Sequence, residues 1–187
     1  MTSTVIDPNE ELRLATFAVG PDLYAMDIMR IREIVRPMPV TPVPKAPAGM
    51  VGVMDLRGQV LPLFDLRLRF DLGPRAEADL IHVRYLIVKL DGRTLGLVVD
   101  QVHDVVNLTR SQLRVGGGVM VGEAAQVFLG VAPVPSPVPS QKGERLALLL
   151  NLRRVLLGAH SIPVDALLRG TNRTILPVPI DIPRGVR

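Results

Sequence analysis

Short runs of alternating hydrophobic and polar residues, separated by turn residues, make up most of the pattern along the chain. Residues 12–26 alternate in this way and are interrupted at Gly20-Pro21-Asp22. Residues 85–99 repeat the arrangement around Asp91-Gly92-Arg93. Alternation with a period of two indicates half-buried strands, and Asp-Gly between two such runs is a strong local hairpin signal. The pattern therefore predicts a β-hairpin in each region.

The two predicted hairpins begin the same order of segments, which indicates an internal repeat. At an offset of 71 residues, residues 17–35 align with residues 88–106, and Glu33 falls on Asp104. Further on, the similarity continues at other offsets: residues 50–53 resemble 128–131, and residues 60–67 resemble 146–153. Short strands also resemble one another by chance, but four segments in the same order favour a repeated β-unit.

Each half of the chain thus contains about five short strands with frequent turns, which is typical of a small barrel or sandwich rather than a parallel sheet with crossover helices. We expect a mainly β fold with two small cores, one in residues 12–75 and one in residues 80–157, if the halves exchange no strands. Residues 27–35 and 153–157 fit a helical turn as well as a strand and stay ambiguous.

Segments rich in glycine, proline or polar residues are expected to lie outside these strands. The predicted connections are residues 71–79 between the halves, the Gly116–Gly118 loop and an extended, solvated excursion at residues 133–143. Residues 1–11 are expected to form a mobile arm without a secretory signal. Residues 158–187 form a proline-rich tail that is expected to be irregular, with a short helix near residues 163–169.

Composition excludes several classes of protein. Of 187 residues, 48% are hydrophobic and 21% are charged, which excludes disorder for most of the chain. The formal charge of +4 is too small for binding based on phosphate neutralisation, and the absence of cysteine excludes disulfides and thiolate sites. The apolar run at residues 146–152 is too short to span a membrane. We expect a cytoplasmic protein that reaches a membrane only through a partner.

Catalytic and cofactor motifs are missing from the sequence. The three histidines are far apart, no serine lies in a nucleophile elbow, and Gly116–Gly118 is not followed by the Lys-Ser/Thr of a phosphate-binding loop. Asp55, Asp65 and Asp100 fall near strand ends, where turn and cap roles explain them. The sequence therefore indicates a binding module with no enzyme activity, no metal and no cofactor.

A small barrel that binds nucleic acid is the alternative interpretation. Proteins that bind single strands stack bases on aromatic side chains, and this chain has two tyrosines, four phenylalanines and no tryptophan. Arginines cluster at Arg30, Arg32 and Arg36, and again at Arg67 and Arg69, but such runs usually form a solvated face. We expect no nucleic-acid partner.

A longer motif connects the two halves to a known family. Residues 24–34 (Tyr-Ala-Met-Asp-Ile through Ile-Arg-Glu-Ile) are followed by a segment that runs from Pro44 to Arg67 and contains Gly-Val-Met-Asp-Leu-Arg-Gly and Leu-Pro-Leu-Phe-Asp-Leu. Together with Gly96–Val105 and Leu148–Leu152, these segments resemble the CheW family of chemotaxis coupling proteins. The resemblance covers about residues 12–157.

The resemblance implies two five-stranded, SH3-like β-barrels packed side by side, in agreement with the repeat. It also implies a non-catalytic adaptor that joins the cytoplasmic tips of methyl-accepting chemoreceptors to the regulatory domain of a CheA-type histidine kinase, within receptor arrays at the inner face of the membrane. No receiver domain is expected to follow, which argues against the CheV variant.

The family pattern also implies partner-binding positions. Arg57 and Gly58 match the Leu-Arg-Gly motif, and Glu33 matches the acidic residue after the Tyr-Ala-x-Asp-Ile strand. For Arg57, an alternative is a structural fork of hydrogen bonds to carbonyls or a carboxylate. Three apolar positions match an expected groove between the barrels that receives a receptor helix, although each fits a core role equally well: Ile31, Val102 and Val105.

Three features depart from the family pattern. Asp55 stands where the family most often has asparagine, and its charge beside Arg57 suggests an ion pair between the two. The excursion at residues 133–143 is longer than a typical hairpin there, and the tail after Gly158 has no family counterpart. These departures leave open which receptor system the chain serves.

Overall fold

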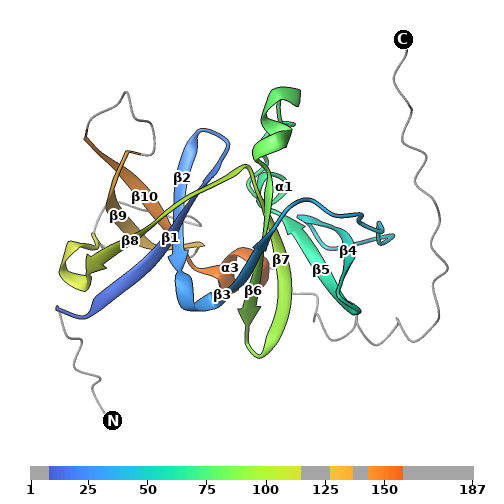
Figure 1. Ribbon diagram of the computed structural model, residues 1–187, viewed down its shortest axis with the longest axis horizontal. Helices are drawn as coiled ribbons and strands as arrows, with labels where there is room; N and C mark the ends of the chain where they lie inside the picture. Colours follow the sequence, from blue (N-terminus) through green and yellow to red (C-terminus); the bar gives the residue numbers. More distant parts are fainter. Residues whose placement is uncertain (1–8, 115–126, 137–142, 158–187) are drawn as a thin grey trace.

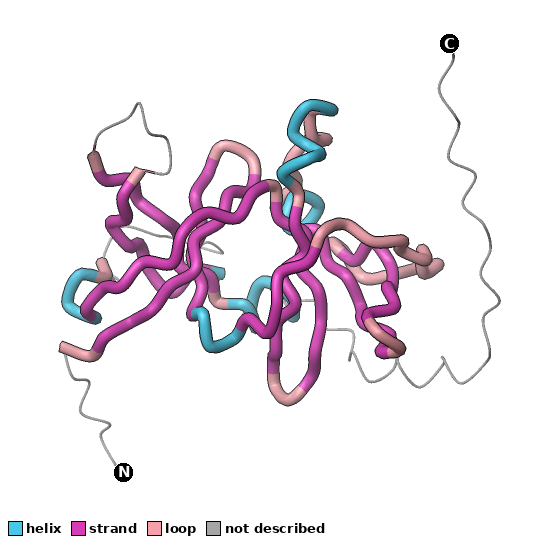
Figure 2. Tube along the Cα trace, viewed as in Figure 1, coloured by secondary structure: helices cyan, strands magenta, loops and turns pink. Residues whose placement is uncertain are grey.

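Ten strands, arranged as two five-stranded sheets, form the body of the protein (Figures 1 and 2). The computed structural model describes residues 9–114, 127–136 and 143–157. In the first sheet the order is β8-β1-β2-β10-β9, with bounds β1 Glu11–Val19, β2 Asp22–Asp27, β8 Gln101–Thr109, β9 Phe128–Pro135 and β10 Glu144–Leu150. In the second the order is β3-β6-β7-β5-β4, with bounds β3 Ile31–Val35, β4 Met50–Leu56, β5 Gln59–Asp65, β6 Arg84–Leu90 and β7 Arg93–Val99.

An isolated bridge between backbone groups links the two edges of each sheet. In the first sheet Arg114, after β8, exchanges two backbone hydrogen bonds with Val131 of β9 at 2.9 and 3.0 Å. In the second, Thr41, after β3, does the same with Val53 of β4 at 2.8 and 2.9 Å. Because the edges meet in this way, we call the first sheet barrel A and the second barrel B. The predicted mainly β fold is confirmed.

The barrels do not follow the predicted division at residues 75–80. That division assumed that the halves exchange no strands, and they do exchange them. Barrel A takes β1 and β2 from the first half and β8–β10 from the second; barrel B takes β3–β5 from the first half and β6–β7 from the second. Only Asp100 separates β7 from β8, so β8 continues into the other barrel (Figure 1). One residue is too short for a hairpin turn, which explains why β8 does not pair with β7.

The exchange is symmetric and agrees with the predicted repeat. When β1–β5 are matched in order to β6–β10, the strand order of one sheet becomes the order of the other. Even the parallel pairs correspond, since β2 pairs with β10 as β7 pairs with β5. Both predicted hairpins, β1–β2 and β6–β7, are also present.

Two hairpin turns use a pair of residues with positive φ. In the β4–β5 turn, Arg57 has φ +55° and Gly58 +84°; in the β6–β7 turn, Asp91 has +48° and Gly92 +81°. Each pair connects directly opposed strand residues, as in a type I′ turn, whose twist matches that of the flanking strands. The Asp-Gly signal therefore predicted the β6–β7 turn correctly.

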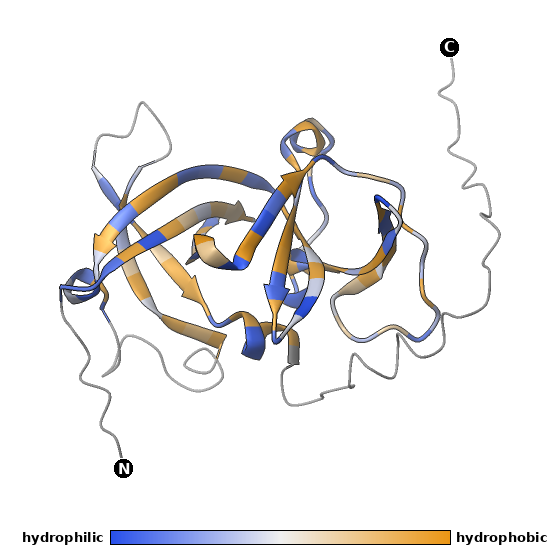
Figure 3. Cartoon of the chain, turned by 60° about the horizontal axis from the view of Figure 1, so that its bottom comes forward, coloured by the Kyte–Doolittle hydropathy of each residue, from blue (hydrophilic) through white to orange (hydrophobic). Residues whose placement is uncertain are grey.

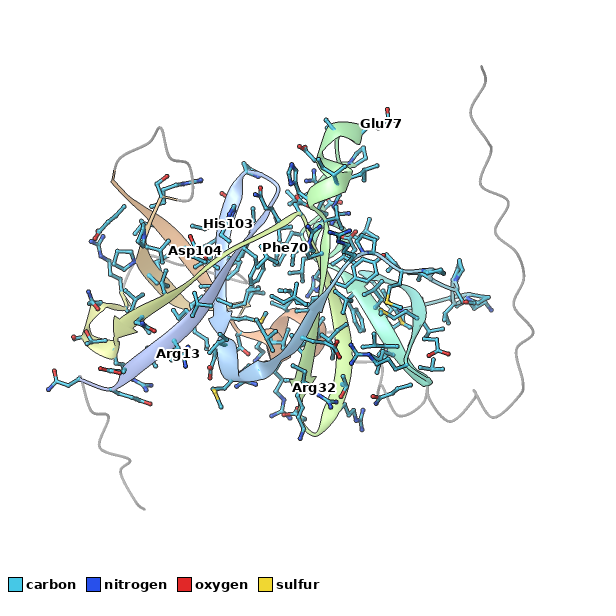
Figure 4. All side chains as sticks on the ribbon, in the orientation of Figure 1. Arg13, Arg32, Phe70, Glu77, His103 and Asp104 are labelled. Carbon is cyan, nitrogen blue, oxygen red and sulfur yellow. The ribbon has the colours of Figure 1, made fainter. Side chains whose placement is uncertain are left out.

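Among the described residues, the apolar core has three parts rather than the two that were expected. One cluster lies within barrel A and another within barrel B. The largest joins residues of both barrels, including Phe17 and Tyr24 from barrel A and Leu97 from barrel B. The ring of Phe70 stacks on Tyr24 at 5.3 Å and lies between the barrels (Figure 4). This inter-barrel core holds the two barrels together as one body.

The ambiguous and connecting segments include several short helices. Residues 27–35 divide into η1 (Ile28–Arg30), which the Asp27 side chain caps, and strand β3. The helical alternative for residues 153–157 is correct, since they lie in α3 (Leu152–Leu157). Further helices among the described residues are α1 (Leu66–Arg69), η2 (Glu77–His82), which begins in the linker between the halves, and η3 (Arg110–Gln112).

The predicted excursion at residues 133–143 begins later than expected, because β9 extends to Pro135. Pro133 and Pro135 are tolerated there since β9 lies at the end of the sheet order, where one side of the strand needs no ladder donors. Of the predicted arm at residues 1–11, residues 1–8 lie outside the described residues, and Glu11 already belongs to β1. The Gly116–Gly118 loop and the tail at residues 158–187 also lie outside the described residues. Within the described part, no helix has the length and apolar character needed to cross a membrane.

Candidate partner-binding surface

The β4–β5 turn presents Arg57 at the end of barrel B. Asp55 accepts a hydrogen bond from the backbone N–H of Gly58 through Oδ1 at 2.7 Å, which ties the turn across its two residues with positive φ. The expected Asp55–Arg57 ion pair is therefore not the arrangement found among the described residues. Asp55 and Gly58 fix the turn, and the Arg57 side chain is free to reach another strand.

Arg57 reaches Glu33 on β3 and forms a forked ion pair with it. Its Nη2 donates to Oε2 at 2.9 Å, and its Nη1 donates to Oε1 at 3.4 Å. The Arg57 side chain is 77% exposed and that of Glu33 31% exposed. A structural role for Arg57 would need a fork of hydrogen bonds to a carboxylate, and that fork is present. However, an exposed ion pair of this kind contributes at most about 1 kcal/mol to stability. The pair is therefore a charged surface feature more than a support of the fold.

The three apolar candidates occupy two different environments. Ile31 and Val102 are partly buried and pack against the inter-barrel core, so a large part of each side chain belongs to that core. Val105 on β8 is 45% exposed, and so is Ile34 on β3, which the sequence pattern did not single out. The hydropathy view shows hydrophobic (orange) and hydrophilic (blue) residues interspersed along the strands (Figure 3).

Glu33 and Asp104 hold equivalent positions in the two barrels. Each strand is bulged at the acidic residue: the register shifts between Ile31 and Glu33 against β6, and between Val102 and Val105 against β1. In barrel A the Thr16 hydroxyl supports the bulge by donating to the carbonyl of Asp104 at 2.7 Å. Bulges turn a side chain away from the regular pleat, and here they direct an acidic residue outward on each barrel.

His103 lies in the β8 bulge beside Asp104 (Figure 4). Burial lowers the pKa of its imidazole below the ordinary 6.5, and the charge of Arg145 lowers it further, while Asp104 acts in the opposite direction. The unfolded chain therefore binds a proton more readily than the folded chain does. The contribution of His103 to stability is full above pH 6.5 and is lost as the pH falls through the folded-state pKa.

We expect the stability of the His103→Gln variant to fall less than that of the parent chain as the pH is lowered. The measurement is the urea midpoint between pH 7.5 and pH 5, compared with the parent and with His82→Gln as a matched control on η2. An unchanged pH profile in His103→Gln would show that this imidazole is not the group responsible.

A cluster of partly buried charges was not anticipated from the sequence. Asp65 caps α1 and Asp100 accepts the Gly20 N–H, so the predicted cap and turn roles are correct. However, Arg75 donates to both carboxylates, which brings together two residues that the sequence left apart. Nothing in the local pattern around Arg75, in the linker between the halves, indicated these partners.

The remaining chemistry of the surface is sparse. Within residues 9–114, 127–136 and 143–157, no group of three or more His, Asp or Glu side chains is placed to hold a metal ion. All six aromatic residues lie in these ranges and none is exposed; four of them contact one another: Phe17, Tyr24, Phe70 and Phe128. Burial, with the charge of Asp22, raises the pKa of Tyr24 to about 12. The stacking platform of a single-strand binder is absent from the surface that these ranges form.

Comparison with known proteins decides the family. A family model described as the CheW-like domain matches residues 13–159, which is most of the chain. The chain belongs to the CheW-like family. The family prediction is thereby confirmed, and with it the class of a chemotaxis scaffold without catalytic activity.

Individual CheW proteins are similar to the chain over much of its length. A chemotaxis protein CheW of Treponema pallidum (strain Nichols) is 30% identical over 125 residues, which are 66% of this chain and 74% of that protein. One of Helicobacter pylori is 36% identical over 107 residues, 57% of this chain and 64% of that protein. The crystal structure of the scaffolding protein TtCheW from Thermoanaerobacter tengcongensis has a TM-score of 0.67 at 23% identity and covers 82% of this chain and 98% of its own, which supports the fold.

Proposed function

We propose that the chain couples the cytoplasmic tips of chemoreceptors to the regulatory domain of a CheA-type histidine kinase. The observation that best supports this is the CheW-like match over residues 13–159, which includes both barrels. The body offers a separate outer face on each barrel, and the inter-barrel core joins the two barrels. A protein built in this way can bind two partners at once without any chemistry of its own, and we place it in the cytoplasm, next to receptor arrays.

Within this function, Arg57 and Glu33 are proposed as partner contacts. Their ion pair is exposed and contributes little to stability, so it is better explained by binding than by folding. Asp55 and Gly58 hold the turn that presents Arg57. Val105 on barrel A and Ile34 on barrel B each offer exposed apolar surface for a receptor helix, while Ile31 and Val102 are partly buried against the inter-barrel core.

The test is a binding experiment with the purified full chain, a chemoreceptor signalling fragment and a CheA-type kinase. We expect each partner to be retained by the chain and all three to be recovered together when they are mixed. Binding to neither partner would contradict the proposal. Co-purified nucleic acid, with binding that weakens steeply as salt is raised, would instead support the small-barrel alternative.

A further inference from the structure

Four charged side chains form a closed cluster where the chain crosses between the barrels: Asp65, Arg67, Arg75 and Asp100. Arg75 donates from Nη1 and Nη2 to the two oxygens of Asp65 at 2.6 and 2.9 Å, and from Nε to Oδ1 of Asp100 at 2.6 Å. Arg67 donates from Nη1 to Oδ2 of Asp100 at 2.6 Å. All four side chains are at most 17% exposed. We call this set the crossing cluster.

The crossing cluster connects the two barrels through Arg75. Asp65 is the last residue of β5 in barrel B. Asp100 is attached to barrel A twice: its backbone N–H donates to the carbonyl of Ala18 on β1 at 3.0 Å, and its Oδ2 accepts the N–H of Gly20 in the β1–β2 turn at 2.6 Å. Arg75 donates to both carboxylates, so one guanidinium joins a residue anchored on each barrel.

The linker that contains Arg75 is itself fixed to the body. Arg67 donates from Nε to the carbonyl of Gly73 at 2.8 Å and from Nη2 to that of Pro74 at 3.2 Å. Leu72 packs against the β1–β2 turn so closely that a Cβ at Gly20 would lie 2.9 Å from its methyl carbon. Leu72, Gly73 and Pro74, which directly precede Arg75, are therefore held by contacts that do not involve Arg75.

The energetics of the cluster favour a role in geometry over a role in stability. Burial lowers the pKa of Arg75, but hydrogen bonds and charges from Asp65 and Asp100 outweigh it, so the net pKa is raised. Desolvating two arginines and two aspartates cancels much of their attraction, and apolar residues of similar volume often stabilise a fold equally well. A guanidinium fork, however, fixes an angle, whereas the apolar contacts of the inter-barrel core have no direction.

We propose that Arg75 is a positioning residue that fixes the orientation of barrel A relative to barrel B. Through that orientation it sets the spacing between the outer faces of the barrels, and this second part rests on the proposed coupling function. Arg75 contacts no partner in this role; it acts through Asp65 and Asp100.

The orientation can be measured directly because the chain contains no cysteine. Spin labels at Lys89→Cys on β6 and Asn107→Cys on β8, both exposed strand positions, report the distance between barrel B and barrel A. We expect a narrow distance distribution in the parent, a broadened or shifted one in Arg75→Met, and no change in Arg154→Met, an exposed arginine of α3. A folded Arg75→Met chain with the parent distribution would overturn the proposal.

Two further measurements keep the test decisive. Arg75→Lys retains the charge without the fork, so it is expected to fold and to broaden the distance distribution even if Arg75→Met does not fold. A parent-like distribution in Arg75→Lys would contradict a role for the fork.

The second measurement is binding. With receptor fragment and kinase, Arg75→Lys is expected to bind each alone within about twofold of the parent, and to form the three-component complex about fivefold more weakly. A parent that binds neither partner overturns the proposed function, while the distances still decide the role of Arg75.

Discussion

The Gly52→Ala substitution is expected to lower the free energy of unfolding by about 4 kcal/mol, as the sum of overpacking and backbone strain. Gly52 lies on β4 with φ +150°, a value that L side chains rarely adopt. A Cβ there would lie 2.3 Å from the carbonyl oxygen of Thr41 and 2.9 Å from its carbonyl carbon. Thr41 cannot move away, because its bridge to Val53 links the edges of barrel B.

Urea unfolding followed by circular dichroism measures this loss. Gly92→Ala is the matched control, since Gly92 also has positive φ (+81°) but a Cβ added there would have no atom within 4 Å. It is expected to cost about 1 kcal/mol, the penalty of the left-handed region alone. Equal losses in the two variants would show that the contact with Thr41 is not the reason for glycine at position 52.

The Arg57→Ala substitution is expected to weaken binding of a receptor signalling fragment about tenfold or more, as for a central arginine of an interface. The fold should survive, because the side chain is 77% exposed and its ion pair with Glu33 contributes at most about 1 kcal/mol. Isothermal titration with the fragment gives the affinity, and urea unfolding gives the stability. A large loss of stability with unchanged affinity would instead assign Arg57 to the fold.

A charge swap separates the two roles of the pair more sharply. Arg57→Glu with Glu33→Arg in the same chain restores an attraction between β3 and the β4–β5 turn but reverses the charges offered to a partner. We expect parent-like stability and weak receptor binding from the swapped chain, whereas Lys89→Ala, at another exposed basic residue of barrel B, should bind normally. Recovery of binding in the swapped chain would argue that only the pair itself matters.

Local signals in the sequence were sufficient for the strands, their hairpins and the repeat. Period-two alternation found both long hairpins, and Asp91-Gly92 marked a turn whose two residues both have positive φ. The Leu-Arg-Gly motif led to the turn that exposes Arg57. The alignment placed Glu33 and Asp104 at equivalent positions, and only the structure shows that both positions are bulged. Each of these features depends on a few neighbouring residues, which is why a single sequence determines them.

Only the tertiary structure decided which strands share a barrel and which charges meet. The exchange of strands follows from the single residue between β7 and β8 and from parallel pairs that join distant segments, such as Leu148 with Tyr24. Arg75 meets Asp65 and Asp100 across 10 and 25 residues because the linker folds back over the crossing point. The alternating pattern records which face of a strand is buried, but many pairings bury the same face; the lengths of the connections and the shared core select one of them.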